Sequence, residues 1–374
     1  MPPKKILFLM PSLVGGGAEN ALIKLLNAFD YEKYKVTLLL VCYRGYYVSK
    51  IPKSVEVKYL FKNHKLVSIL EYLQKKRGWS LLLNWAFKRK INENYDTAIS
   101  FIDSNFTDLL FLLSPTTKKI TWVHSSYLTN KNYNRFHQHK KYLNKIKESR
   151  YKKLDTIVFV SNDAKIEFIE VMGKFDNMHI LYNLFDEVDL IQKSQITLPP
   201  KQVITFIAVG KLAPVKGYDL LIDAAKILKD EGFNFRLEIL GKGHQESELK
   251  AKVQKYELKN EIQFLGYLEN PYTYINRADV FVMTSVSEGL PSALIEAMII
   301  GKPVLITDTS GCREVIEYGK YGMMSDRTPE AFAEKMKLFI DNPDLKDKYA
   351  ALSRYKAKDF SKQNTLSKIF EIID

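Results

Sequence analysis

The 374-residue chain lacks several features that would place it in a familiar class. It has only two cysteines, Cys42 and Cys312, which lie far apart and without the spacing of metal ligands. A disulfide framework or a zinc site is therefore not indicated, and a reducing compartment fits this cysteine usage. No apolar run approaches the roughly 20 residues of a membrane span. The apolar run near the start is too short for the core of a signal peptide.

Signatures of a nicotinamide cofactor and of a bound metal ion are also missing. Glycines 15–17 follow the first predicted strand, but their spacing is not the dinucleotide fingerprint. The second predicted strand, residues 34–41, ends without the acidic residue that would hold a ribose. No Asp-x-Asp pair follows a strand, so a divalent metal is not required. We therefore rank an oxidoreductase low and expect neither a metal nor a cofactor.

Acidic residues are scarce in the first half of the chain only. The net charge is +13, and residues 1–189 hold 30 Lys and Arg against 18 Asp and Glu, whereas residues 190–374 hold 26 against 25. The two halves are therefore expected to face different partners. A basic half is typical of a surface for anionic lipid, nucleic acid or phosphorylated acceptors.

Strand-like runs alternate with helical stripes along the whole chain, which predicts an α/β fold with doubly wound parallel sheets. The proline-containing residues 191–202 are predicted to form a linker. We therefore predict one domain over residues 1–190 and a second over residues 203–356. A C-terminal helix within residues 357–374 is expected to pack back on the first domain.

One strand–loop–helix–strand unit organises the second half. Residues 280–283 and 304–307 are short apolar runs typical of buried strands. Pro291 suits the first turn of the helix between them, and Gly301 suits its end. Such a unit forms a parallel crossover, and ligands collect at the carboxyl ends of its strands.

Acids and lysines are predicted at this same edge of the second sheet. Glu288 lies in the loop, and Glu296 lies in an otherwise apolar helix, where a buried carboxylate needs a partner. Lys211 and Lys216 lie in another strand-to-helix loop, and two lysines there suit a pyrophosphate near a positive helix end. The alternative is exposed loop lysines without a ligand.

The first half has its own candidate groups at strand ends. Glycines 15–17 precede a predicted helix, so their backbone N–H groups could approach an anion; a tight turn is an equally good interpretation. His124 follows the predicted strand 119–123 and is placed for hydrogen bonding at the sheet edge. A structural histidine is the alternative.

Two basic segments lie in the first half. Residues 62–90 hold eight Lys or Arg and one acid, together with Trp79 and Trp85. This pattern is typical of a helix in a membrane interface, and an ordinary surface helix is equally compatible with it. Residues 131–153 hold nine Lys or Arg with interleaved tyrosines. They suit single-stranded nucleic acid or an acidic surface.

Five matches in order give the chain a specific resemblance. The most specific is the motif from Ser287 to Ala297, in which Glu288 and Glu296 enclose seven residues. The other matching stretches are residues 15–19, 123–125, 182–183 and 209–217. The chain resembles the retaining glycosyltransferases of family 4 over nearly its whole length. The resemblance implies the GT-B fold, with two Rossmann-like domains facing a central cleft.

The resemblance also implies roles for individual residues. Glu296 would accept hydrogen bonds from ribose hydroxyls, Lys211 and Lys216 would hold the diphosphate, and Glu288 would hold hydroxyls of the donor sugar. His124 would touch the sugar or orient the acceptor. The predicted catalytic residues are His124, Lys216 and Glu288. The predicted donor-binding residues are Gly16, Gly17, Gly210, Lys211, Lys216, Gly241, Tyr267, Glu288, Gly289, Leu290, Ser292 and Glu296, and the predicted sugar or acceptor contacts are Asn105, His124 and Asn183.

The resemblance implies a metal-independent, retaining transferase that moves a sugar from a nucleotide-diphosphate donor, a UDP-sugar by analogy, to a glycan or polyprenyl-diphosphate-linked acceptor. Bacterial surface polysaccharide synthesis at the cytoplasmic face of the membrane would be its setting. Residues 62–90 and 131–153 would then contact anionic lipid. A sugar-nucleotide epimerase of the same fold is the alternative. A nucleic-acid-binding protein ranks last, because it leaves Lys216, Glu288 and Glu296 unexplained.

Overall fold

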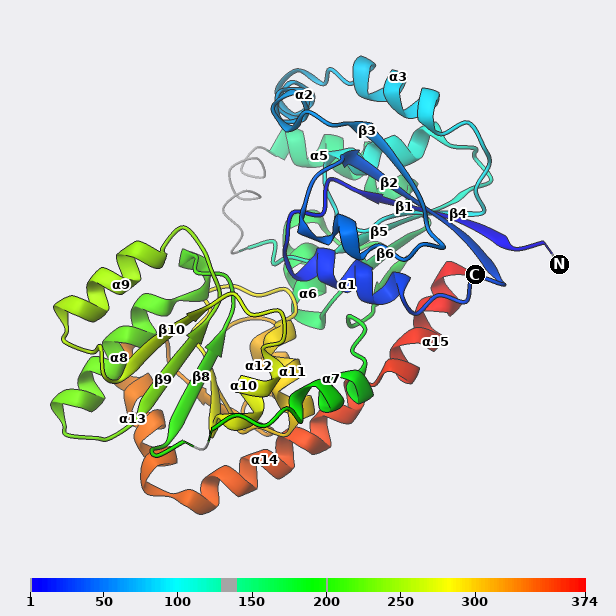
Figure 1. The fold of residues 1–374 in the computed structure, drawn as a ribbon. Helices are drawn as coiled ribbons and strands as arrows, with labels where there is room; N and C mark the ends of the chain where they lie inside the picture. Colours follow the sequence, from blue (N-terminus) through cyan, green and yellow to red (C-terminus); the bar gives the residue numbers. More distant parts are fainter. Residues whose placement is uncertain (1, 129–139, 200) are drawn as a thin grey trace. The chain divides into compact units, whose positions relative to one another are not determined.

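The computed structural model describes residues 2–128, 140–199 and 201–374. The chain divides into two compact units, residues 1–184 with 365–374, and residues 185–364. Each unit contains one parallel sheet with helices packed around it (Figure 1). The prediction of two Rossmann-like α/β domains is therefore confirmed.

Unit 1 has a seven-stranded parallel sheet in the order β3-β2-β1-β4-β5-β6-β7. The interior strand β1 is buried from Ile6 to Met10, with each residue at most 1% exposed, as expected for a strand covered on both faces. The strand order reverses between β1 and β4. The strands are β1 Lys4–Met10, β2 Tyr34–Cys42, β3 Glu56–Phe61, β4 Thr97–Ser100, β5 Lys118–Val123, β6 Thr156–Phe159 and β7 Met178–Ile180.

The helices of unit 1 connect these strands or close the unit at its end. They are α1 Gly17–Leu26, α2 His64–Arg77, α3 Leu81–Lys90, α5 Lys140–Ser149 and α6 Asn162–Met172, with short 3₁₀ segments η1 Tyr46–Lys50, η2 Asn105–Leu112 and η3 Tyr151–Lys153. Of the basic segment 131–153, residues 131–139 lie outside the described part of the chain.

Unit 2 has a six-stranded parallel sheet in the order β10-β9-β8-β11-β12-β13, which reverses between β8 and β11. The predicted strand–loop–helix–strand unit is confirmed, because β11 and β12 pair in parallel and the helix α11 connects them along the chain. The strands are β8 Thr205–Val209, β9 Arg236–Leu240, β10 Ile262–Gly266, β11 Val280–Met283, β12 Val304–Thr307 and β13 Met323–Ser325. The helices are α7 Glu187–Ser194, α8 Tyr218–Asp230, α9 Glu246–Lys255, α10 Tyr272–Arg277, α11 Ser292–Ile300, α12 Cys312–Val315, α13 Pro329–Asp341 and α14 Pro343–Ala357, with 3₁₀ segments η4 Pro214–Lys216 and η5 Lys358–Phe360.

The predicted linker at residues 191–202 was partly wrong. The units divide at Leu184 and Phe185, and residues 187–194 form the helix α7. This helix belongs to unit 2, because the side-chain amides of Asn270 and Asn276 donate to the carbonyls of Lys193 (3.0 Å) and Ser194 (3.1 Å). The polar composition of the segment gave no sign of these long-range contacts.

The last helix, α15 Lys362–Ile373, begins in unit 2, and its residues from Thr365 onward belong to unit 1. There Phe370 stacks on Tyr34, with ring centroids 5.2 Å apart. Thr97 donates a hydrogen bond to the Ile373 carbonyl (2.9 Å). These contacts tie the end of the chain to the strands β2 and β4.

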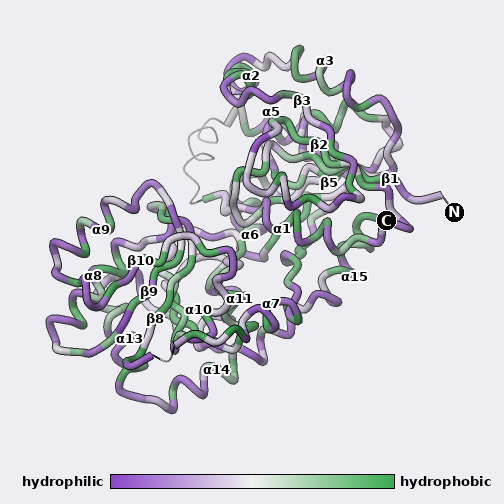
Figure 2. Tube along the Cα trace, in the orientation of Figure 1, coloured by the Kyte–Doolittle hydropathy of each residue, from purple (hydrophilic) through white to green (hydrophobic). Residues whose placement is uncertain are grey.

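Only some of the apolar residues of α2 and α3 enter the core. Ile69 of α2, Leu82 of α3 and Trp79 in the turn between the helices have exposed side chains. The side chains that enter the core of unit 1 are Val67, Leu70, Leu83, Ala86 and Phe87. Hydrophobic and hydrophilic residues are mixed along both helices, as the changing colours in Figure 2 show, so hydropathy alone does not indicate which apolar residues are buried.

Candidate active site

Three loops meet at the point where the strand order of the unit 2 sheet reverses. They follow β8, β9 and β11 and are joined by backbone hydrogen bonds from Gly210 to Leu240 (2.9 Å), from Leu212 to Lys242 (3.1 Å) and from Val286 to Val215 (2.8 Å). Such reversal points are where open parallel sheets bind their ligands. The loops after β8 and β11 contain half of the predicted donor-binding residues.

Glycines make this close packing possible. Gly217 has φ of 64°, and a Cβ placed there would lie 2.1 Å from the carbonyl oxygen of Thr284 in the β11 loop. Gly241 has φ of 145°, and its Cβ would lie 1.8 Å from the carbonyl oxygen of Gly210. A larger residue at either position would push two of the loops apart.

Lys216 and Glu288 form an ion pair across the two loops. Lys216 Nζ lies 2.5 Å from Glu288 Oε1, and Ser285 Oγ donates to the same oxygen at 2.6 Å. The pair is largely buried, since 10% of the Glu288 side chain and 24% of the Lys216 side chain are exposed. The structure thus brings two of the predicted catalytic residues together. Ser285, which the sequence reasoning missed, could have been found from its place two residues after strand β11.

Glu296 is buried in α11, at 7% exposure. The hydroxyl of Tyr272 donates to its Oε1 over 3.4 Å. This is a long hydrogen bond, so the carboxylate keeps capacity for further donors. Tyr272 is a second residue that the sequence reasoning missed.

The other predicted donor residues of unit 2 lie around this pair. Lys211 and Tyr267 are exposed on the loops after β8 and β10. Gly289 and Leu290 continue the β11 loop to Ser292, the first residue of α11, whose N-terminus has no side-chain cap. A helix N-terminus presents backbone N–H groups and a positive dipole end to an anion.

The predicted residues of unit 1 lie at the carboxyl ends of its strands. Gly16 is the N-cap residue of α1 and Gly17 is its first residue. His124 directly follows β5, and its Nε2 is buried without a hydrogen-bond partner among the described residues, as is Nδ2 of Asn105 after β4. Asn183 is buried at 8% exposure.

The imidazole of His124 packs beside two aromatic rings and is neutral. Its centroid lies 4.8 Å from that of Phe101 and 6.5 Å from that of Trp122. Burial lowers the pKa of His124 to about 3, and a backbone hydrogen bond at Phe101 only partly opposes this shift. His124 can therefore hydrogen-bond a ligand at neutral pH, but it does not carry a charge there.

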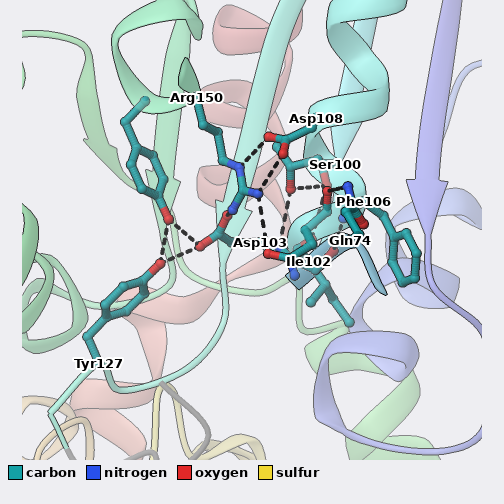
Figure 3. Close-up of polar contacts among 12 residues, drawn as sticks. Gln74, Ser100, Ile102, Asp103, Phe106, Asp108, Tyr127 and Arg150 are labelled. Carbon is teal, nitrogen blue, oxygen red and sulfur yellow. Dashed lines mark hydrogen bonds and ion pairs between the residues drawn. The ribbon is translucent and has the colours of Figure 1, made fainter. Parts of the chain in front are cut away.

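A buried polar network surrounds Asp103, which lies between β4 and η2 (Figure 3). Tyr151 donates to Asp103 Oδ2 at 2.8 Å, Tyr127 donates to the same oxygen, and the two hydroxyls lie 2.7 Å apart. Arg150 Nε donates to Asp108 Oδ1 at 2.6 Å. Burial raises the pKa of Asp103, and Arg150 acts in the opposite direction. Tyr151 lies in the basic segment 131–153, and its burial was not predicted from the sequence.

Among residues 2–128, 140–199 and 201–374, no group of three or more His, Cys, Asp or Glu side chains could hold a metal ion.

Comparison with known proteins identifies the class. Residues 15–188 match the family described as Glycosyltransferase Family 4, and residues 191–359 match the family described as glycosyl transferases group 1. The chain belongs to this family of GT-B glycosyltransferases, and the resemblance inferred from its motifs is confirmed.

Individual relatives agree with this assignment. An uncharacterized glycosyltransferase of Methanocaldococcus jannaschii is 28% identical over 72% of this chain and 75% of its own length. A putative colanic acid biosynthesis glycosyltransferase, WcaL of Salmonella typhimurium, is 33% identical over 44% of this chain and 43% of its own length. An N-acetylgalactosaminyltransferase of Campylobacter jejuni, whose name specifies a diphospho-undecaprenol-linked acceptor, is 32% identical over 49% of this chain and 50% of its own length.

A solved structure shares the fold over nearly the whole chain. Anabaena HepE, crystallised with UDP and glucose, is 19% identical, with a TM-score of 0.76 over 98% of each chain. The chain is a glycosyltransferase of the kind found in bacterial polysaccharide biosynthesis.

Proposed function

We propose that the protein is a retaining, metal-independent glycosyltransferase that moves a sugar from a UDP-sugar to a lipid-linked or glycan acceptor. The observation that carries this proposal is the Lys216–Glu288 pair at the reversal point of the unit 2 sheet. A lysine there matches the charge of a diphosphate, and a carboxylate beside it can accept hydrogen bonds from sugar hydroxyls.

The proposed donor set divides by chemistry. Lys211 and Lys216, with the uncapped N-terminus of α11, stabilise the charge that grows on the leaving diphosphate. Such preorganised groups can supply several kcal/mol of transition-state stabilisation. Glu296 accepts hydrogen bonds from the ribose, and the exposed Tyr267 contacts the base. Glu288 positions the donor sugar.

Unit 1 supplies the proposed contacts to the sugar and the acceptor. Gly16 and Gly17 approach the donor through the backbone, because neither carries a side chain. Asn105 and His124 each have a polar atom without a protein partner among the described residues. The buried Asn183 is the third proposed contact. Because burial lowers the pKa of His124 to about 3, its imidazole is a weak proton acceptor, and the proposed base for the acceptor hydroxyl is the leaving phosphate.

The choice of UDP and of a lipid-linked acceptor is drawn from similar proteins. HepE was crystallised with UDP and glucose, and pneumococcal GtfA with UDP and GlcNAc. The Campylobacter relative takes an acceptor on diphospho-undecaprenol by its name. We propose that this chain acts on a donor and an acceptor of the same classes, at the cytoplasmic face of the membrane.

A hydrolysis screen over nucleotide sugars tests the proposal, because many transferases slowly cleave their own donor. One UDP-sugar should be cleaved, and Lys216→Ala and Glu296→Ala should abolish cleavage. Lys255→Ala, an exposed lysine of α9, is the matched control and should retain it. Full activity in both site variants would refute the site. NMR of the product anomer tests retention, and turnover in EDTA tests metal independence.

A further inference from the structure

The helices α2 and α3 and the turn between them expose six large apolar side chains, which we call the α2–α3 patch. Leu81 is 85% exposed, Trp79 59% and Trp85 56%. The complete set is Ile69, Tyr72, Trp79, Leu81, Leu82 and Trp85. Apolar groups concentrated in one short segment of surface indicate an interaction site.

The α2–α3 patch is not needed by the core of unit 1. The helices contact that core through different residues, Val67 and Leu70 of α2 and Leu83, Ala86 and Phe87 of α3. Each helix therefore has a second apolar surface that the fold leaves in water. Within the described chain no helix is long and apolar enough to cross a membrane, so a patch of this kind could lie on a bilayer but not span it.

Cations accompany the aromatic rings of the patch. Arg77 lies over the ring of Trp79 at 5.3 Å, Arg89 over Trp85 at 5.4 Å, and Lys76 over Tyr72 at 5.4 Å. Residues 62–90 contain eight Lys or Arg, and their one acid, Glu71, lies 2.7 Å from Lys75. The surface around the apolar groups is thus strongly positive.

We propose that the α2–α3 patch docks the enzyme on an anionic lipid bilayer, with Trp79, Leu81 and Trp85 inserted at the level of the headgroups. Trp rings paired with Arg suit this region, because the ring enters the apolar boundary while the guanidinium stays with the phosphates. Nucleic acid fits less well, since it offers no apolar medium for Leu81 and Leu82. This inference rests on the proposed function, because an enzyme with a lipid-linked acceptor must reach the bilayer that holds the acceptor.

Sedimentation of the full chain with vesicles tests the proposal. Vesicles of phosphatidylglycerol and phosphatidylcholine in equal amounts should bind the protein at low salt. Vesicles of phosphatidylcholine alone should bind it much more weakly, and added salt should release it. Lys76→Gln with Arg89→Gln should weaken binding about 30-fold, from about 1 kcal/mol for each cation near the surface. Trp79→Ala with Leu81→Ser and Trp85→Ala should weaken it by at least about 10-fold.

Matched controls keep the test specific. Val188→Ser with Ile196→Ser removes exposed apolar groups from unit 2 and should bind like the wild type. Lys152→Gln with Lys153→Gln removes cations from the other basic segment and should reduce binding less than the α2–α3 variants. All these variants should hydrolyse free donor like the wild type, so a failed membrane contact is distinguishable from a failed donor site.

Three outcomes would overturn the proposal. They are wild-type protein that stays in the supernatant at low salt, α2–α3 variants that bind like the wild type, and binding that does not depend on anionic lipid. Loss of binding in the Lys152 and Lys153 variant alone would assign the membrane contact to the other basic segment instead.

Discussion

Substitutions of Lys216 and Glu288 should change UDP affinity in opposite directions. Lys216 and Glu288 bind each other at 2.5 Å, so the carboxylate would compete with a diphosphate for the lysine. Lys216→Met removes the cation that would bind the phosphate. Glu288→Gln removes its competitor and retains an oxygen that can accept the hydrogen bond from Ser285.

The magnitudes follow from this geometry. A hydrogen bond to a charged group contributes about 1.5–3 kcal/mol, so Lys216→Met should weaken UDP binding roughly 10- to 150-fold. In the Glu288→Gln variant Lys216 is released from an ion pair that contributes about 1 kcal/mol. This variant should therefore bind UDP up to about 5-fold more tightly than the wild type. In the absence of UDP both substitutions break the same pair, so both should lower the free energy of unfolding.

Isothermal titration with UDP measures the affinities, and urea unfolding without UDP measures the stabilities. Glu288→Gln should bind UDP at least as well as the wild type and yet lose transfer, because the positioning of the donor sugar is lost. Weaker UDP binding by Glu288→Gln, comparable to that of Lys216→Met, would refute the competition between carboxylate and phosphate.

Three further predictions concern the loops around the candidate site. Burial holds the pKa of His124 at about 3 against an ordinary value of 6.5, so protonation favours the unfolded chain and stability falls as the pH drops from 6.5 towards 3. Between about pH 7.5 and pH 5 the wild type should lose about 2 kcal/mol more unfolding free energy than His124→Gln, and equal losses in urea titrations would contradict a buried neutral imidazole. Tyr127→Phe should lower the unfolding free energy by about 1–3 kcal/mol because it removes a buried hydrogen bond to Asp103, whereas the exposed Tyr355→Phe should change it by less than about 0.5 kcal/mol. Gly217→Ala should abolish UDP binding, because its Cβ would lie 2.1 Å from a carbonyl of the β11 loop; Gly232→Ala, with positive φ and nothing within 4 Å, controls for backbone strain and should bind UDP normally.

Local features of the sequence were sufficient for the α/β class and for most of the site. Continuous apolar runs predict buried strands, and the residues that follow a strand in a parallel sheet must lie at its carboxyl edge. This is why Lys216, Glu288 and His124 could be placed at sheet edges without coordinates. The motif from Ser287 to Ala297 then indicated the family.

Contacts between distant segments could not be predicted in the same way. Which side chains meet depends on how the elements pack in three dimensions, and local sequence patterns do not contain that information. The pairing of Lys216 with Glu288, the tyrosines around Asp103 and the attachment of α7 to unit 2 all join residues far apart in the chain. The burial of individual apolar residues in α2 and α3 could not be predicted from the sequence either. The sequence specifies helices with apolar groups on several faces, and only packing against the sheet determines that Leu70 and Leu83 are buried while Trp79 and Leu81 remain in water.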